Sequence, residues 1–355
     1  MENKRIYYLD IAKAIALLLV IFGHTFRESM RDSFLWCSFS YDFVYKFHVS
    51  AFFLFSGISY KITRDKYLNK SSVGYIGKKA NDILKPWFAY SVLVYIIFCT
   101  IQLIPKISEI LSNSSYKTIS PITYLFNLVC NENPYAFHLW FLYTLFFATV
   151  ICFLIDKFLK GKKAFALQVA LIIILPTVYS LFCDDLVWAI KGLAQKAPFF
   201  LLGVVIDKSV VEKRPKIWAA LGLLALILLG GFTAVQNDIW NSINSKFLSV
   251  VLTYLEYAVV LLISLGILGF CILIETKAKH LERLGKYSMT YYIYHQPFCC
   301  AVAGIVLYDV AKLPVIAVII ACMALSIIIP VVIGFLVKKL HLIKIFDVIG
   351  LPYKY

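Results

Sequence analysis

Residues 5–26 read RIYYLDIAKAIALLLVIFGHTF. Most of these side chains are apolar, and the stretch has the length of a helix that crosses the hydrocarbon core of a bilayer, about 20 residues. Only Asp10, Lys13 and His24 interrupt it. Because these groups break the apolar run and no small-residue cleavage site follows, we expect the segment to stay in the mature protein. The stretch predicts a membrane-spanning helix that carries ionisable groups.

The rest of the 355-residue chain has the same character. It is 61% hydrophobic and 15% charged, whereas a soluble domain is about 25% charged. Apolar runs long enough to span a membrane occur at 6–26, 47–60, 86–104, 138–155, 165–183, 186–206, 217–235, 249–274, 287–308 and 315–337. We predict an all-α polytopic membrane protein of about ten transmembrane helices. Residues 1–355 are expected to form a single integral membrane domain without an appended soluble domain.

Two of these ten spans are less regular than the others. The run at 47–60 is short unless it includes Tyr41 to Tyr45, and the run at 186–206 contains Lys191, Lys196 and Pro198.

The positive charges indicate the orientation. Lys and Arg number 35 against 20 Asp and Glu, which gives a net charge of +15. With ten spans, 25 of the 35 basic residues fall on the side of the N-terminus, seven on the other side and three inside spans. Because basic residues accumulate in cytoplasmic connections, both termini are predicted to be cytoplasmic. This placement accounts for the excess charge without nucleic acid as a partner.

The ionisable residues of the first span are candidates for chemistry, since each costs about 2.5–3.5 kcal/mol to insert. Lys13 and His24 are eleven residues apart, which places them on one helix face about 16 Å apart. Asp10 precedes Lys13 by three positions and Glu28 follows His24 by four, so each acid is expected beside its basic neighbour. A simple ion pair at one end and an interfacial histidine at the other is the alternative. His24 is the first candidate for a general base. Glu28 is either the group that orients the imidazole or a solvated acid in the following connection.

Further polar residues are expected near the outer ends of other spans. His48 and Ser56 lie in FHVSAFFLFSG (47–57), and His138 and Trp140 begin HLWFLYTLF (138–146). His24, His48 and His138 are expected to converge at one face of the membrane. His295 lies in the ninth span beside Pro297, which is expected to kink that helix. A histidine hydrogen-bonded to a neighbouring helix is the competing interpretation for His295.

The connection at 61–85 is strongly basic. It contains Lys61, Arg64, Lys66, Lys70, Lys78, Lys79 and Lys85 against only Asp65 and Asp82. Seven positive charges exceed what orientation requires. Contact with anionic membrane lipid is one explanation, and a docking site for a phosphorylated cytosolic ligand is the other.

The nine cysteines lack the spacing of a metal site, and no metal is expected. Most lie in or beside apolar runs. Cys37, Cys130 and Cys183 fall on the predicted outer side, where a disulfide would be compatible with the environment.

Five segments together resemble a known family. In order they are YLDIAKAIALLLVIFGH (8–24), FHVSAFFLFSG (47–57), the basic stretch that leads into LKPWFAY (84–90), HLWFLYTLF (138–146) and LGKYSMTYYIYHQ (284–296). They resemble the membrane-integral acyltransferase family 3, and more closely its branch of fucose 4-O-acetylase-like and polysaccharide O-acetyltransferases. The family pattern of a basic residue followed after ten positions by a catalytic histidine falls on Lys13 and His24. Many members have Arg at the position of Lys13.

The resemblance implies acyl transfer, usually of acetyl, from cytosolic acetyl-coenzyme A to a sugar hydroxyl on the outer side of a bacterial cell membrane. Lys61, Arg64, Lys78, Lys79 and Lys85 would then bind the coenzyme, which is a cosubstrate. Asp10, His48, Ser56, His138, Trp140 and His295 would line the substrate path, with His138, Ser56 or His295 as candidate oxyanion donors. His24 would take the proton of the acceptor hydroxyl, and an acetyl-histidine relay is the competing mechanism.

Two other classes of function are compatible with parts of the sequence. A transporter or flippase for an anionic or lipid-linked sugar would use the same intramembrane charges as a pathway. A receptor or structural membrane protein explains the hydropathy but not the charged face of the first span.

Overall fold

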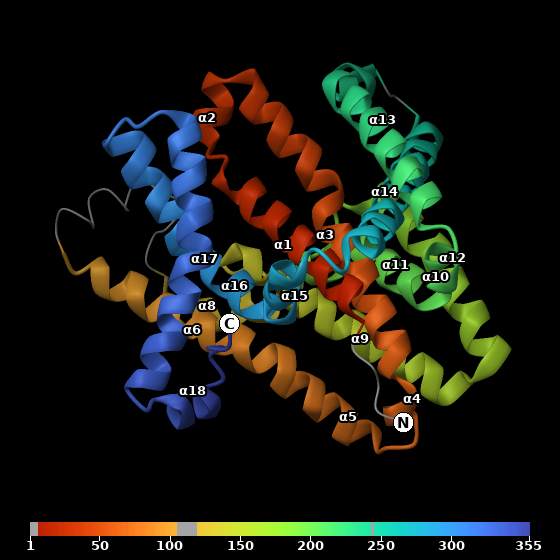
Figure 1. The fold of residues 1–355 in the computed structure, drawn as a ribbon, viewed down its shortest axis with the longest axis horizontal. Coiled ribbons are helices and arrows are strands. Elements are labelled where there is room, and N and C mark those ends of the chain that lie inside the picture. Colours follow the sequence, from red (N-terminus) through yellow and green to blue (C-terminus); the bar gives the residue numbers. More distant parts are fainter. Residues whose placement is uncertain (1–5, 105–118, 243–244) are drawn as a thin grey trace.

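The computed structural model describes residues 6–104, 119–242 and 245–355, with side chains except at 236–242. These residues form helices and connections and contain no strand. The predicted all-α polytopic membrane fold is therefore confirmed (Figure 1).

The helices follow one another closely along the chain. The first part contains α1 (Tyr7–Thr25), α2 (Glu28–Ser33), α3 (Leu35–Thr63), α4 (Asp65–Leu68), α5 (Ser72–Lys79), η1 (Ala80–Leu84), α6 (Lys85–Ile101), α8 (Pro121–Val129), η2 (Phe137–Leu139) and α9 (Trp140–Leu159). The second part contains α10 (Gly161–Phe182), α11 (Trp188–Val205), α12 (Ser209–Glu212), α13 (Pro215–Ser242), α14 (Lys246–Ile274), α15 (Lys279–Lys286), α16 (Ser288–Tyr294), η3 (His295–Val302), η4 (Ile305–Val310), α17 (Val315–Lys339) and α18 (Ile343–Ile349).

Eight helical segments in the described part of the chain are long and apolar enough to cross a membrane. They are Tyr7–Thr25, Ser72–Ile101, Phe137–Leu159, Gly161–Phe182, Pro215–Val235, Lys246–Ile274, Ser288–Val310 and Val315–Lys339. The ten spans predicted from the sequence exceed this number by two. The difference falls on the two less regular runs, 47–60 and 186–206, which lie in α3 and α11.

The polar character of α3 and α11 follows from their interior position. Both are long helices, of 29 and 18 residues, and they pack against each other. A Cβ added to Gly57 would lie 2.0 Å from the backbone oxygen of Phe200, and one added to Gly203 would lie 2.2 Å from that of Leu54. This contact confirms that Gly57 serves close helix packing. Since their neighbours are other helices and cavities, α3 and α11 tolerate polar residues that lipid would exclude.

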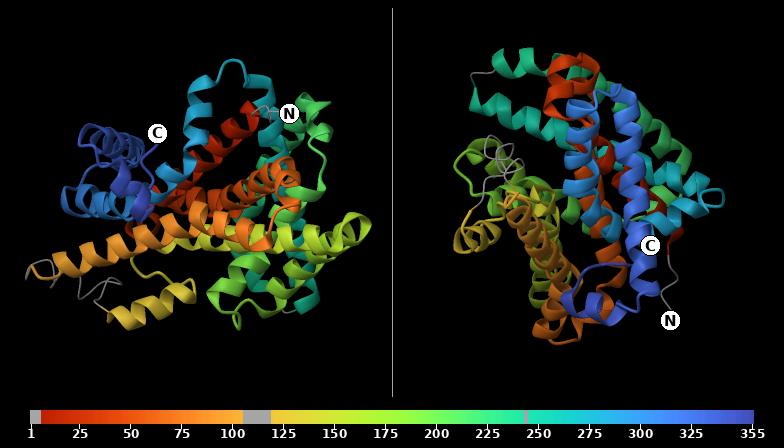
Figure 2. Two further views of the ribbon diagram at one scale, coloured as in Figure 1. Left: turned by 90° about the horizontal axis from the view of Figure 1, so that it is seen from below. Right: turned by 90° about the vertical axis from the view of Figure 1, so that its left-hand side faces the viewer.

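The other helices surround this interior. In Figure 1, α1 and α3 lie between the α13–α14 pair and the C-terminal helix α17. The α13–α14 pair is also tightly packed, because a Cβ on Gly222 would lie 2.5 Å from the Cα of Gly266. The rod formed by α5, η1 and α6 runs beside α9 (Figure 2).

The ninth predicted span is interrupted, as Pro297 predicts. Gln296 has non-helical backbone angles, φ −126° and ψ 151°, between α16 and the rest of η3. Tyr90 donates its hydroxyl hydrogen to the carbonyl oxygen of Gln296 at 2.7 Å. That bond satisfies a backbone group which the broken helix leaves without a partner.

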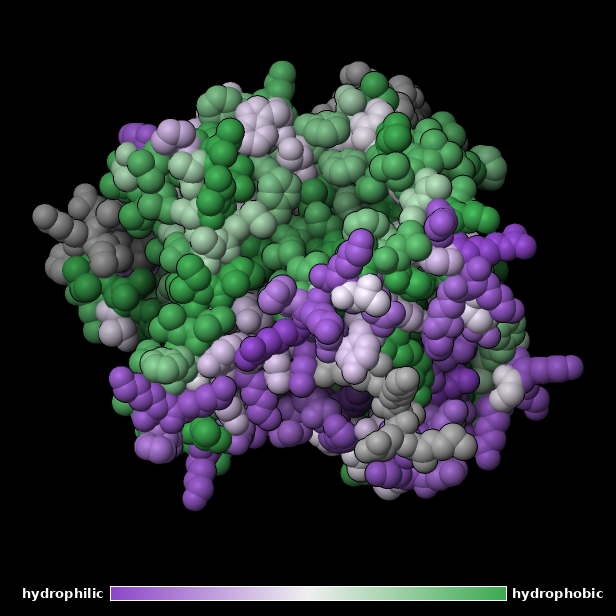
Figure 3. Space-filling model, viewed as in Figure 1, coloured by the Kyte–Doolittle hydropathy of each residue, from purple (hydrophilic) through white to green (hydrophobic). Residues whose placement is uncertain are grey.

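Polar residues gather at one end of the molecule. In the view of Figure 3 they cover the lower part, over the region where Figure 1 places α4, α5, α15 and α18, whereas the upper part is apolar. The start of α1 and the C-terminus both lie in this polar region. Which side of the membrane it faces stays a prediction from the charges.

Candidate functional site

A cavity of about 430 Å³ lies among α1, α3, the segment before α9, α11 and the α16–η3 kink. Its lining includes His24, His48, His138 and Trp140. The structure thus brings to one place the three histidines that the sequence led us to expect together.

His24 lies at the end of α1, where Tyr45 of α3 contacts it. A hydrogen bond of 3.0 Å joins Tyr45 Oη and His24 Nδ1. Either atom can be the donor, because a hydroxyl both donates and accepts and the imidazole has two tautomers. The Cβ of a residue at Gly23 would lie 3.0 Å from the Tyr45 ring, so the absence of a side chain there lets α3 approach. Tyr45 was not among the residues singled out in the sequence.

Glu28 does not lie beside His24, and the expected spacing of one helical turn was wrong. α1 ends at Thr25, Phe26 and Arg27 have extended backbone angles, and Glu28 begins the separate helix α2 with an exposed side chain. The neighbouring Arg27 explains the break: its guanidinium is 2.8 Å from Asp309 and donates to the carbonyl oxygen of Ala301 at 3.1 Å. These contacts fix the connection against η3 and η4.

The other cavity histidines are held by backbone carbonyls. His48 Nδ1 lies 2.6 Å from the carbonyl oxygen of Val44, and His138 Nε2 lies 3.2 Å from that of Ile293. A carbonyl only accepts, so each of these nitrogens carries the hydrogen. Their tautomers are thereby fixed, in contrast to that of His24.

His295 belongs to the same cluster although it does not line the cavity. It is fully buried, and its ring centre is 5.2 Å from that of His24 and 5.1 Å from that of His138. Its Nδ1 donates to the carbonyl oxygen of Tyr292 at 2.5 Å. Within the described residues its Nε2 has no hydrogen-bond partner. The hydrogen bond of His295 is thus to a carbonyl three residues earlier in its own span and not to a neighbouring helix, and its ring lies against those of His24 and His138.

Lys196 of α11 is a cavity residue that the sequence analysis left out of the site. It is 7% exposed, lines the histidine cavity, and donates to Ser50 Oγ at 3.1 Å. A lysine inside a predicted span was the signal that marked it. The packing of α11 against α3 could not be predicted from the sequence.

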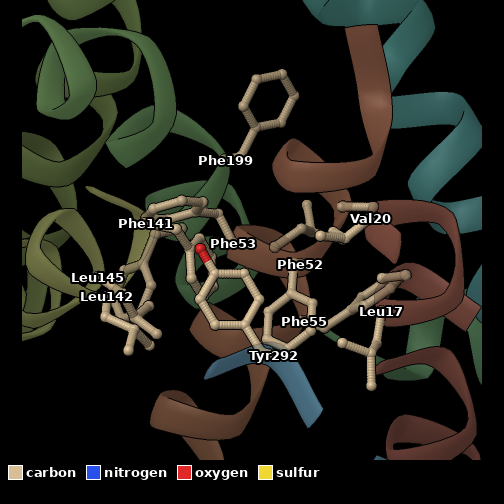
Figure 4. Close-up of a cluster of buried hydrophobic side chains, with 14 of the residues drawn as sticks. Leu17, Val20, Phe52, Phe53, Phe55, Phe141, Leu142, Leu145, Phe199 and Tyr292 are labelled. Atoms are coloured by element: carbon tan, nitrogen blue, oxygen red, sulfur yellow. The ribbon is translucent and has the colours of Figure 1, made fainter. Parts of the chain in front are cut away.

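A layer of apolar and aromatic side chains packs around the middle of α1, and two of its members, Val20 and Tyr292, line the cavity. Figure 4 shows Leu17 and Val20 of α1 together with Phe52, Phe55 and Tyr292. Leu17 and Phe55 are fully buried. Leu17 lies between Lys13 and His24 on α1, so apolar packing separates the two ends of the predicted charged face.

Three further predicted site residues lie outside the histidine cavity. Asp10 and Lys13 are half-buried near the start of α1, and both make interactions in the structure. A Cβ on Gly285 would lie 1.7 Å from the backbone oxygen of Asp10, so α15 packs directly on this part of α1. Ser56 is half-buried, eight residues beyond His48 on α3, and does not line the cavity.

Two of the five predicted coenzyme-binding residues lie at the far end of α3. Lys61 and Arg64 line a cavity of about 340 Å³ with Lys157 in the last turn of α9 and Lys160 of the α9–α10 connection. Arg64 Nη1 is 3.0 Å from Asp156. Lys61 donates to the carbonyl oxygens of residues 205 and 206, at 3.3 and 3.1 Å, where α11 ends.

The other three predicted residues are elsewhere. Lys78 is 2.7 Å from Asp82, and Lys79 Nζ is 5.6 Å from the centre of the Tyr75 ring. Lys85 donates to the backbone oxygen of Asp347 at 2.7 Å. The structure does not bring the five basic residues together; each already has a contact within the protein.

Cys37, Cys130 and Cys183 are free thiols in the structure. In the described ranges, no group of three or more His, Cys, Asp or Glu side chains has the geometry of a metal site.

Comparison with known proteins places the chain in a family. Neither a curated protein nor a solved structure matches it. A family model described as an acyltransferase domain, that of acyltransferase family 3, matches residues 6–335. The match runs through α1, α3, α9, α11 and α16, the helices that build the histidine cavity. This chain therefore belongs to acyltransferase family 3 and is a membrane acyltransferase.

Proposed function

We propose that the protein transfers an acetyl group from cytosolic acetyl-coenzyme A to a hydroxyl of a cell-surface or lipid-linked sugar on the outer side of the membrane. The histidine cavity is the observation that carries this proposal. It holds a group able to accept a proton, a buried cation and several aromatic side chains, at the opposite end of α3 from the basic cavity.

His24 is the proposed general base. With its Nδ1–H donated to Tyr45 Oη, His24 Nε2 keeps a lone pair for the acceptor hydroxyl. His24 suits this role better than His48 or His138, because its side chain is partly accessible at the cavity whereas theirs are buried. The Tyr45 hydroxyl accepts from Nδ1–H whether or not Nε2 carries a proton, so it holds the ring throughout the reaction.

The reaction consists of one acyl exchange. Nε2 of His24 removes the hydroxyl proton as the sugar oxygen attacks the thioester carbonyl carbon. The tetrahedral intermediate then collapses: the carbon–sulfur bond breaks, and the thiolate of coenzyme A takes the proton back from His24. The products are the acetyl ester and coenzyme A, and no oxidant or metal is needed for the balance.

Lys196 is the proposed stabiliser of the negative oxygen in that intermediate. Its ammonium lines the cavity, has three N–H donors, and gives one of them to Ser50. A fixed positive charge in a water-poor site favours charge that develops during the reaction. Ser56, one of the donors suggested by the sequence, is outside the cavity. His138 lines it and His295 lies in ring contact with His138, so they remain in the surroundings of the oxyanion.

The coenzyme is proposed to dock at the basic cavity. Lys61, Arg64, Lys157 and Lys160 supply four positive charges there against the single carboxylate of Asp156, which suits the phosphates of acetyl-coenzyme A. Arg64, the residue that follows α3, is sixteen positions beyond His48, a rise of about 24 Å along the helix. The pantetheine arm would have to cross this distance, so the apolar layer of Figure 4 must part when the donor binds.

The acceptor is proposed to be a sugar because the cavity is rich in aromatic faces. Trp140, Phe137 and Tyr41 line it beside the histidines. Such faces pack against the apolar side of a sugar ring, while the imidazoles and amides contact its hydroxyl groups. The same aromatic and polar lining supports the proposal that the chain belongs to the polysaccharide O-acetyltransferase branch of the family.

The proposal is tested by the mass of the surface polysaccharide from cells with and without the gene. We expect one or more acetyl groups to be missing from a defined sugar when the gene is deleted. A wild-type copy should restore them and His24→Ala should not, at equal amounts of membrane-inserted protein. His280→Ala is the matched control, since His280 is exposed on α15. An unchanged polysaccharide mass after deletion would contradict the proposal.

A further inference from the structure

A second cavity, of about 270 Å³, lies directly beside the histidine cavity. The two share Gln195 and Lys196 of α11 as lining residues. The second cavity lies among α3, α10, α11 and α14. Apart from the shared Lys196, its lining has no part in the reaction proposed above or in the coenzyme site.

The lining of this second cavity is polar to a degree that a membrane interior rarely allows. Ten of its thirteen lining residues carry nitrogen or oxygen in the side chain. Only Phe199, Val260 and Cys183 do not. Because polar side chains inside a bilayer are costly, such a lining indicates a site for a hydrophilic ligand.

Charges of both signs face the second cavity. Lys46 Nζ and Glu256 Oε1 are 4.0 Å apart, which is beyond hydrogen-bond distance. Both side chains are partly accessible, 13% and 28%. A ligand hydroxyl between them can accept from the ammonium and donate to the carboxylate. The two ammonium groups and one carboxylate of this lining leave an excess of one positive charge, against three at the basic cavity, so a phosphate is favoured less here.

The remaining polar groups form a fixed wall. Gln195 Nε2 donates to Tyr179 Oη at 2.9 Å, and Tyr257 Oη donates to the backbone oxygen of Gln195 at 2.6 Å. Ser180 Oγ and Ser249 Oγ are 3.1 Å apart. These bonds hold the groups in place before a ligand arrives, which reduces the entropy lost on binding.

We propose that this second cavity is the subsite for the acceptor glycan, and that it binds the hydroxyl groups of a sugar unit between Glu256 and Lys46. The reactive hydroxyl then passes Lys196 and reaches His24. This inference rests on the proposed function. A polyhydroxylated ligand fits because it offers donors and acceptors together, as the lining does, whereas an acyl chain would leave the polar groups without partners.

The test is the kinetics of Glu256→Gln in the purified, detergent-solubilised protein. The acceptor is surface polysaccharide from producing cells, stripped of its acetyl groups by mild base, and the donor is acetyl-coenzyme A. We expect the KM for the polysaccharide to rise at least tenfold and the KM for acetyl-coenzyme A to stay within twofold. Glu275→Gln, at the other end of α14 and outside both cavities, is the matched control.

Three outcomes decide the matter. An unchanged KM for the polysaccharide, or a raised KM for acetyl-coenzyme A instead, would overturn the acceptor subsite. Absence of transfer by the wild-type protein would count against the proposed function itself and is thus distinguishable. If Glu256→Gln does not fold, Thr253→Val decides in its place. It keeps the side-chain shape and removes one hydroxyl of the lining, and it should raise the same KM at least threefold.

Discussion

At the residue scale, His24 differs from the other three histidines of the site in the group that contacts its ring. His48, His138 and His295 each donate to a backbone carbonyl, so each neutral ring is held in one tautomer. His24 contacts the Tyr45 hydroxyl instead. The site therefore contains one imidazole for which both tautomers are compatible with its hydrogen bond, surrounded by three whose tautomers are fixed by carbonyls.

Tyr45→Phe tests this arrangement. Loss of the hydroxyl leaves the His24 ring without its partner at 3.0 Å. We expect kcat to fall about tenfold, less than the about 10²- to 10⁴-fold cost of removing a general base. Tyr143→Phe is the control, because it also removes one hydroxyl hydrogen bond, to the carbonyl oxygen of Val129, but lies outside the cavity. Equal kcat values for the two variants would show that the Tyr45 hydroxyl does not assist His24.

Lys196 provides a second test at this scale. Lys196→Met keeps much of the side-chain volume and removes the charge, so we expect kcat to fall about 10²- to 10³-fold, as with other oxyanion donors. Lys196→Arg should retain part of the activity. Lys191→Met, five residues earlier on α11, is the control, since Lys191 packs over Trp188 and lines neither cavity. Acetyl transfer by Lys196→Met at the wild-type rate would refute the assignment.

The sequence was informative about residues wherever the order of the spans determines the side of the membrane on which they lie. It led to His24, His48, His138 and Trp140, which line one cavity. It failed for Glu28 because the i, i+4 relation holds only within one helix, and α1 ends at Thr25. The contact of Tyr45 with His24 depends on how α1 and α3 pack. No local sequence pattern predicts that packing.

At the scale of the elements, the α3–α11 contact shapes the site. α3 carries Tyr45 and His48, α11 carries Lys196, and Gly57 and Gly203 let their backbones touch. The sequence identified both helices but not their interior position. A membrane span is recognised in a sequence by its many apolar residues. A helix that is surrounded by other helices of the protein does not need an apolar surface. This is why the two least regular runs form the centre of the protein.

Gly57→Ala tests the importance of that contact. The added Cβ would lie 2.0 Å from the backbone oxygen of Phe200, and such overpacking costs about 1–3 kcal/mol. We expect a lower thermal unfolding temperature in detergent, together with reduced transfer activity. Gly231→Ala on α13 is the control, because no atom lies within 4 Å of its added Cβ and alanine favours a helix. Similar unfolding temperatures for both variants would show that the contact is not tight in solution.

At the scale of the whole molecule, the basic residues responsible for the net charge of +15 are gathered at one end (Figure 3). The basic residues predicted to be cytoplasmic cluster where α4, α5, α15 and α18 lie, and the polar surface of Figure 3 covers that end. An acyl donor with several phosphates would encounter this surface first. The histidine cavity lies at the opposite ends of α1 and α3.

The orientation is testable with a C-terminal reporter. Because basic connections remain in the cytoplasm, a fluorescent protein fused after residue 355 should fluoresce, and an alkaline phosphatase fused at the same place should be inactive. A second fusion, in the connection between α2 and α3, should give the reverse pattern. An active phosphatase at the C-terminus would invert the proposed path of the acetyl group.

The protein is proposed to move acetyl from a donor on one side of the membrane to a sugar on the other, with His24 as the base that activates the sugar hydroxyl. The most direct test of this claim is a liposome that contains the purified protein, with deacetylated polysaccharide inside and labelled acetyl-coenzyme A outside. We predict that the wild-type protein, and not His24→Ala, esterifies the enclosed polysaccharide with label. Label that stays on the coenzyme, or that reaches the polysaccharide equally with His24→Ala, would contradict the claim.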